Sequence, residues 1–153
     1  MLLNLPMPVI ITLNIIGWPV IHLTLGSLAT RWSRQTVDRL GTLLPLLPGE
    51  TIRRYDRWLR IRRWKNALPD AADWFHGGIT KSAVIHSPAF REQLRLETLR
   101  SEAAHWLMLL AAGIFLLWNP LWAAVVMVTV ALLLNMPCIL VQRYNRLRAM
   151  RRL

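Results

Sequence analysis

Two long uncharged stretches dominate the pattern of hydrophobic and polar positions along the chain. Residues 2–30 contain no charged side chain, and residues 103–141 contain no Asp, Glu, Lys or Arg over 39 positions. Because a helix needs about 20 apolar residues to cross a bilayer, the first stretch predicts one span. The second stretch is too long for one helix, and Asn119-Pro120 near its middle is a turn signal that divides it into two.

This pattern predicts an all-α integral membrane protein with three transmembrane helices, at about residues 6–30, 103–118 and 121–141. A cleaved signal peptide is the alternative for the first stretch, but that stretch lacks a charged n-region and is longer than an h-region. The second predicted span is short, so we expect the bilayer to thin locally or the helix to extend into the polar residues before it. The whole chain, 1–153, is expected to form a single membrane domain.

Composition and charge support the membrane class. The chain is 54% hydrophobic with a mean hydropathy of +0.33, yet it carries 19 Lys+Arg against 8 Asp+Glu, a net charge of +11. A nucleic-acid-binding protein can be equally basic, but long uncharged apolar runs would not separate its charges. We therefore expect membrane lipid, and no nucleic acid, as a partner. The single cysteine, Cys138, cannot form an internal disulfide.

The positions of the basic residues predict the orientation in the membrane. Fourteen lie within residues 31–100 and five within the tail, 142–153, whereas the N-terminal flank and the hairpin turn hold none. By the positive-inside rule, the segment 31–102 and the tail face the cytoplasm and the N-terminus lies outside. The expected location is the inner (cytoplasmic) membrane, as a multi-pass protein.

The segment 31–102 is expected to lie along the cytoplasmic membrane surface. It carries 14 basic and 8 acidic residues, a net charge of +6. Residues 43–49 are apolar and broken by prolines, which favours a dip into the interface. Residues 53–65 place aromatic and aliphatic side chains on one stripe among seven basic neighbours, which predicts an amphipathic helix lying flat in the headgroups.

Two further local signals lie in the same segment. Gly77 and Gly78 predict a bend. Ser87-Pro88 predicts the capped start of a helix from about Ala89 that continues into the second span.

The first cluster of possible chemistry surrounds His105. On a helix Glu102 and His105 are i, i+3 neighbours, so the carboxylate can hold the imidazole, and a histidine so placed can act as general base on a hydroxyl. The alternative is a capped helix start with His105 at the membrane interface. His105 lies about one turn into the second span and Asn135 about two turns before the cytoplasmic end of the third. Antiparallel packing would therefore bring them to similar depth.

The second cluster follows Asn135. Asn135 and Gln142 are i, i+7 and share a helix face, and polar side chains in a span usually face the bundle interior. The arginines after Gln142 could bind phosphates, or they could be a stop-transfer anchor that holds anionic lipid headgroups. Cys138 could carry an acyl group, but with no activating base beside it a buried small side chain is favoured.

Stronger catalytic signals are missing from the sequence. It contains no HxxxxD acyltransferase box, P-loop, GxSxG or CxxC motif. His76 and His86 are ten residues apart without cysteine partners, so we expect no metal and no bound cofactor.

Taken together, the two clusters resemble the glycosyl-4,4′-diaponeurosporenoate acyltransferases, small membrane enzymes of the staphyloxanthin pathway. The resemblance covers about residues 54–148. Arg63-Trp64-Lys65, with Leu68 and Asp70, is similar to the Arg-x-Trp-Lys stretch of that family. The other residues that carry it are Glu97, Thr98, Arg100, Glu102, His105, Trp106, Asn135, Pro137, Gln142, Arg143, Tyr144, Asn145, Arg146 and Arg148.

The resemblance implies transfer of a fatty acyl group from an activated donor, acyl-CoA as the co-substrate, to a sugar hydroxyl of a glycosylated carotenoid or related glycolipid. In this interpretation His105 is the base, Glu102 orients it, and Asn135 and Gln142 place the acceptor. Lys65 and Arg143 are the choices for the donor phosphates. The remaining predicted substrate-binding residues are Trp64, Glu97, Arg100, Tyr144, Asn145 and Arg146.

A non-catalytic function stays open beside this one. A membrane subunit could use its arginine-rich cytoplasmic face to recruit an enzyme or anionic lipid. Polarity within the spans separates the two hypotheses, because a scaffold does not need His105 and Asn135 near one depth. Methyl transfer to a lipid is a third possibility, but the chain has no glycine-rich cofactor loop.

Overall fold

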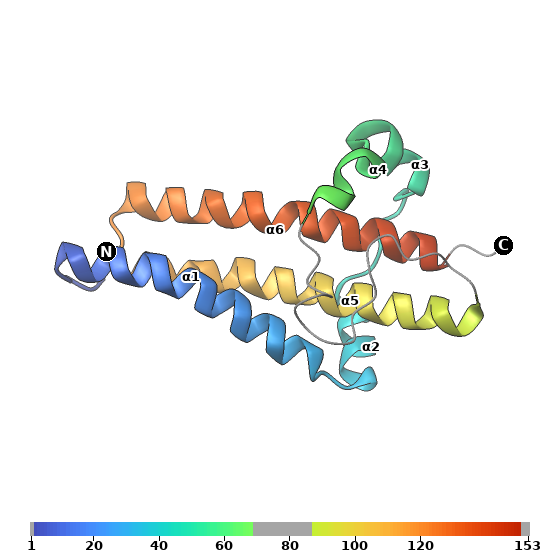
Figure 1. Cartoon of the computed structure of the whole chain (residues 1–153), viewed down its shortest axis with the longest axis horizontal. Helices are drawn as coiled ribbons and strands as arrows, with labels where there is room; N and C mark the ends of the chain where they lie inside the picture. Colours follow the sequence, from blue (N-terminus) through green and yellow to red (C-terminus); the bar gives the residue numbers. More distant parts are fainter. Residues whose placement is uncertain (1, 69–86, 151–153) are drawn as a thin grey trace.

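Three long helices form a bundle, and the short helices gather around one end of it (Figure 1). The computed structural model describes residues 2–68 and 87–150, and every regular element in those ranges is helical. The long helices are α1 (Met7–Thr30), α5 (Pro88–Ala111) and α6 (Leu121–Met150). The predicted all-α fold is confirmed. The bend predicted at Gly77 and Gly78, like the His76 and His86 pair, lies outside the described residues.

Three helical stretches are long and apolar enough to cross a membrane: Met7–Thr30, Pro88–Leu117 and Leu121–Met150. Their outward faces carry large apolar side chains, with Ile15, Leu110 and Leu133 each about two-thirds or more exposed (67%, 75% and 68%). A contiguous apolar surface of this kind is stable against lipid and not against water. The chain is therefore a membrane protein with three spans, as predicted.

The second span reaches membrane length in two ways. As the capping signal predicted, α5 starts at Pro88, where the Ser87 hydroxyl accepts a hydrogen bond from the Phe90 amide at 3.1 Å. At its other end the helix tightens into the 3₁₀ helix η4 (Ala112–Leu117). Because a 3₁₀ helix rises about 2.0 Å per residue against 1.5 Å in an α-helix, the uncharged part from Ala103 spans about 25 Å.

Small residues let α5 and α6 pack closely as an antiparallel hairpin. The buried face of α5 includes Ala103 and Ala104, and that of α6 includes Ala124 and Ala131. Such residues bring helix backbones together where no hydrophobic force between helices acts. Ala29 of α1 joins a cluster with Ala104 and Met108 of α5.

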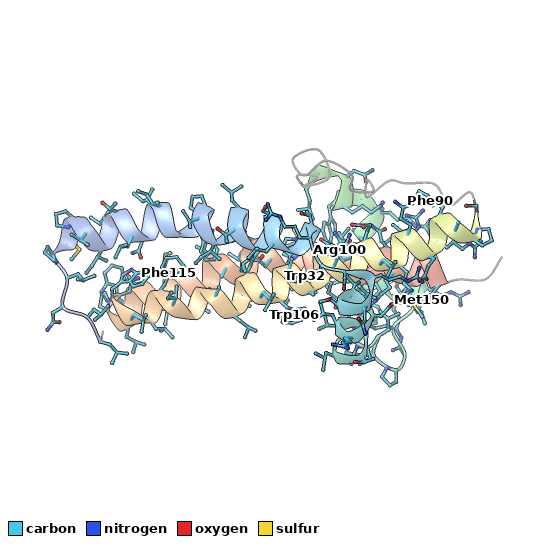
Figure 2. The ribbon with its side chains drawn as sticks, turned by 90° about the horizontal axis from the view of Figure 1, so that it is seen from below. Trp32, Phe90, Arg100, Trp106, Phe115 and Met150 are labelled. Atoms are coloured by element: carbon cyan, nitrogen blue, oxygen red, sulfur yellow. The ribbon has the colours of Figure 1, made fainter. Side chains whose placement is uncertain are left out.

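Polar side chains join α1 to the hairpin turn at the end opposite the charges. Asn14 donates a hydrogen bond to Asn119 Oδ1 at 2.8 Å, and its own Oδ1 accepts from Trp118 Nε1 and Asn119 Nδ2, both at 2.9 Å. Phe115 packs beside these groups, with its ring centroid 5.5 Å from that of Trp18. Figure 2 places Phe115 near this end, and Phe90 and Met150 near the other.

At the charged end, α2 (Arg34–Leu43) packs against the polar start of α5. Arg95 of α5 binds Asp38 at 2.7 Å and Glu92 at 2.8 Å, and Arg34 binds Glu92 at 2.6 Å. These pairs attach the first basic helix to the charged first part of α5.

The sequence predicts one continuous amphipathic helix at residues 53–65, and this prediction is wrong because the segment is divided into short helices of different types. The segment consists of α3 (Ile52–Arg54), the π-helix η1 (Tyr55–Leu59), α4 (Ile61–Trp64) and the 3₁₀ helix η2 (Lys65–Ala67). Arg60 interrupts it with a left-handed φ of 48°. The interruption turns Tyr55 and Ile61 toward the same cluster on α6, with Val141 and Tyr144. Trp58 and Leu59 stay exposed, as an interfacial position requires.

Candidate functional site

His105 and Asn135 meet across the α5–α6 hairpin. His105 Nδ1 lies 2.9 Å from Asn135 Oδ1, which confirms the proximity predicted from their depths. Asn135 is 1% exposed, and its Nδ2 donates to the Ala131 carbonyl at 2.9 Å. This bond turns Oδ1 toward the histidine, and because Oδ1 only accepts, Nδ1 carries the proton. In the neutral ring the lone pair is then on Nε2.

Glu102 occupies a position different from the predicted one. Its carboxylate, fully buried, binds Arg143 Nη1 at 2.6 Å and Arg146 Nη2 at 3.0 Å. Among the described residues, His105 is hydrogen-bonded to Asn135, whereas Glu102 binds two arginines. The expectation that Glu102 orients the imidazole is corrected accordingly, because the rotation of α5 turns Glu102 toward the arginine face of α6.

Glu50 completes a buried cluster of charges with these three residues. Its carboxylate lies 2.9 Å from Arg143 Nη2 and 3.1 Å from Arg143 Nε. Two carboxylates therefore face two guanidinium groups, which balances the charge away from water. We call Glu50, Glu102, Arg143 and Arg146 the charge cluster.

Backbone carbonyls of the loop before Glu50 bind the same arginines. Arg143 Nη2 donates to Pro45 O and Arg146 Nη2 donates to Leu44 O, each at 2.9 Å. The apolar loop that was predicted to dip into the interface thus crosses onto α6, with Leu43 and Leu47 left exposed. The guanidinium group of an arginine donates to carboxylate and carbonyl oxygens at the same time. The compact ammonium group of a lysine is less suited to this geometry.

Tyrosines extend the site toward the basic segment. The rings of Tyr55 and Tyr144 lie 6.1 Å apart between centroids, and Arg62 Nε donates to the Tyr144 hydroxyl at 3.1 Å. Burial raises the pKa of the Tyr55 phenol, and the nearby Glu50 raises it further. Tyr55 therefore stays neutral at physiological pH.

The remaining predicted residues fall at several places around this site. Arg100 pairs with Glu97 and donates to the Trp32 carbonyl at 3.2 Å, a junction of α1, α2 and α5 that Figure 2 shows around the Trp32 and Arg100 labels. Trp64 donates to Leu59 O at 2.8 Å. Asn145 accepts from Arg148 at 3.4 Å. Gln142 is half-buried on α6.

Lys65 and Arg143, the choices for the donor phosphates, are both buried, at 8% and 9% exposure. Arg143 is moreover occupied by Glu50 and Glu102. Neither position offers a phosphate the open cationic surface that the interpretation requires.

No sequence motif marks Glu50 or the backbone carbonyls of Leu44 and Pro45 as part of the site. The available signal is weak: Glu50 is a single carboxylate between an apolar Pro-Gly loop and an arginine run. Within residues 2–68 and 87–150, His, Cys, Asp and Glu form no group of three that could hold a metal ion.

Comparisons of the sequence with known proteins agree on one family. Residues 40–153 match the family model of glycosyl-4,4′-diaponeurosporenoate acyltransferase. A protein of that name from Staphylococcus aureus (strain bovine RF122 / ET3-1) is 26% identical over 134 residues, which cover 86% of this chain and 80% of the relative. Its counterpart from strain USA300 is 25% identical over 133 residues, with the same coverage. No solved structure matches.

Proposed function

The chain belongs to the glycosyl-4,4′-diaponeurosporenoate acyltransferase family, and from this membership we propose that it moves a fatty acyl group from an activated donor to a sugar hydroxyl of a glycosylated carotenoid or related glycolipid. The observation that carries a catalytic function is the hydrogen bond between His105 and Asn135 inside the hairpin. Polar groups within a span are costly and usually functional.

In the proposed mechanism His105 is the general base. Nε2 takes the proton of the acceptor hydroxyl while the oxygen attacks the carbonyl carbon of the donor, taken as a thioester. The tetrahedral intermediate then collapses, the bond from carbonyl carbon to sulfur breaks, and the leaving thiolate takes the proton back from Nε2. Asn135 fixes the tautomer through Nδ1 and stabilises the imidazolium that forms.

The charge cluster is assigned a positioning function in this mechanism. Glu102 and His105 lie one helical turn apart on α5, and Arg143 and Asn135 lie on α6. The bonds from Glu102 to Arg143 and Arg146 therefore set the relative height of the two helices that carry the base and its partner.

The function is tested first by lipid mass spectrometry of cells with and without the gene. We expect a glycolipid whose mass decreases by one acyl chain when the gene is deleted, and returns when the gene is restored. Complementation with His105→Ala is the matched control. A lipid profile that is unchanged between the strains with and without the gene contradicts acyl transfer and favours the non-catalytic subunit.

The orientation is a separate prediction. The short helices α2, α3 and α4, which carry many of the described arginines, lie toward one end of the bundle, and the turn that begins α6 lies at the other (Figure 1). We therefore expect reporter fusions after Arg39 to give a cytoplasmic signal and fusions at Asn119 an external one. A cytoplasmic signal at Asn119 contradicts the topology, and with it a site at the cytoplasmic face.

A further inference from the structure

Three arginines at the start of the segment from α3 to α4 lack counter-charges among the described residues. Six other arginines, one of them within the same segment, pair with carboxylates: Arg34, Arg62, Arg95, Arg100, Arg143 and Arg146. Within the described ranges, by contrast, no carboxylate lies within 4.0 Å of Arg53, Arg54 or Arg57. Three adjacent guanidinium groups repel one another, so this arrangement favours a bound anion.

These arginines line one groove. It has a volume of ≈ 590 Å³ and is lined by Thr51, Arg53, Arg54, Arg57 and Trp58. This is within the range of about 300–1,000 Å³ that small-molecule sites occupy. Trp58 is 78% exposed, which leaves an indole face beside the guanidinium groups.

The groove is built on fixed backbone. The Thr51 hydroxyl accepts a hydrogen bond from the Arg54 amide at 3.2 Å and caps α3. Gly49 has a φ of +87°, and a Cβ there would lie 2.6 Å from Arg54 Nη1, so glycine is what lets this guanidinium lie across the turn. Behind the groove, Tyr55 packs on Tyr144 of α6. The segment that carries the arginines therefore rests on α6 (Figure 1).

We propose that this groove binds the 3′-phosphorylated adenosine diphosphate end of an acyl-CoA, an inference that rests on the proposed acyl transfer. A coenzyme A brings a pyrophosphate, a 3′-phosphate and a planar base together. Guanidinium forks bind phosphates and an exposed indole stacks on a base. A lipid headgroup offers a phosphate but no planar base, so the groove fits the nucleotide better.

The position on α6 suits the rest of the donor. Tyr144, which contacts the segment, is nine residues after Asn135 on the same helix, about 13 Å along its axis. The pantetheine arm of coenzyme A is an extended chain that covers such a separation. Its thioester can then lie near His105 while the nucleotide stays at the aqueous surface.

The test measures binding of coenzyme A to the full chain in nanodiscs of neutral phosphatidylcholine. We expect Arg53→Gln, Arg54→Gln and Arg57→Gln each to weaken binding about tenfold. Arg31→Gln, which removes the same charge from an exposed position outside the groove, should leave the affinity close to the wild-type value. Trp58→Leu should weaken coenzyme A but not inorganic pyrophosphate.

Two measurements on the unaltered chain keep the test independent of how the variants fold. Coenzyme A should bind more tightly than 3′-dephospho-coenzyme A, and its affinity should fall as salt is raised. Equal binding of the two forms overturns the inference. It is also overturned if phosphatidylglycerol in the nanodisc abolishes coenzyme A binding and the three variants lose the lipid instead, which would make the groove a lipid headgroup site.

Measuring coenzyme A binding and acyl transfer separately distinguishes a failure of the proposed groove from a failure of the proposed function. Acyl transfer without coenzyme A binding, for example from an acyl carrier protein alone, overturns the groove and leaves the function standing. Binding that depends on the three arginines without any acyl transfer supports the groove and contradicts the function.

Discussion

His105→Ala should lower the rate of acyl transfer by about 10²–10⁴-fold, which is the usual contribution of a general base. The loss should appear in kcat more than in KM, because the base acts on the hydroxyl in the transition state. The measurement is initial rate with a glycolipid acceptor and an acyl-CoA donor, using purified protein in nanodiscs. Coenzyme A binding to the same variant should be unchanged.

His22→Ala is the matched control for this substitution. His22 lies on α1, where its Nδ1 is 3.0 Å from the Trp18 carbonyl, and it belongs to no part of the proposed site. It should retain near-normal turnover. If His105→Ala does the same, the mechanism is wrong even though the family membership stands.

Glu102→Ala should destabilise the folded protein by about 3–5 kcal/mol, because it removes one member of a buried set of ion pairs. Among partners in residues 2–68 and 87–150, Arg146 would keep the Leu44 carbonyl, and Arg143 would keep Glu50 and the Pro45 carbonyl. Glu102→Gln should cost less, since its amide oxygen still accepts one hydrogen bond. Denaturant unfolding in detergent micelles measures the change.

Glu92→Ala provides the comparison for the buried carboxylate. Glu92 also binds two arginines, Arg34 and Arg95, but its side chain is 38% exposed. Ion pairs in water contribute about 1 kcal/mol or less, so this change should cost far less than Glu102→Ala. Similar costs at the two positions would contradict a structural function for the charge cluster.

The spans could be predicted because a bilayer imposes length and apolarity on contiguous residues. The same holds for the helix start at Ser87, whose capping hydroxyl and the proline after it act within one turn. The similar depth of His105 and Asn135 followed from the rise per residue of two antiparallel helices. These are properties of neighbouring positions or of simple geometry.

What could not be predicted depends on rotation about helix axes and on contacts between distant residues. Glu102 and Arg143 are 41 positions apart, and Glu50 and Arg143 are 93 positions apart. No local sequence pattern predicts these two ion pairs. The stripe in residues 53–65 has helical spacing, but Arg60 adopts a left-handed conformation so that residues on both sides of it reach α6. Packing against α6 outweighs the local preference for a straight helix there.

The charge cluster has a consequence for biosynthesis. A ribosome makes Glu50 and Glu102 before it makes Arg143 and Arg146, so a nascent chain holds both acids without the cations that neutralise them in the finished fold. The Leu44 and Pro45 carbonyls likewise accept hydrogen bonds from arginines of α6, which is synthesised after them. Arrival of the last helix therefore completes the charged end of the bundle and supplies the donors that hold the loop before Glu50.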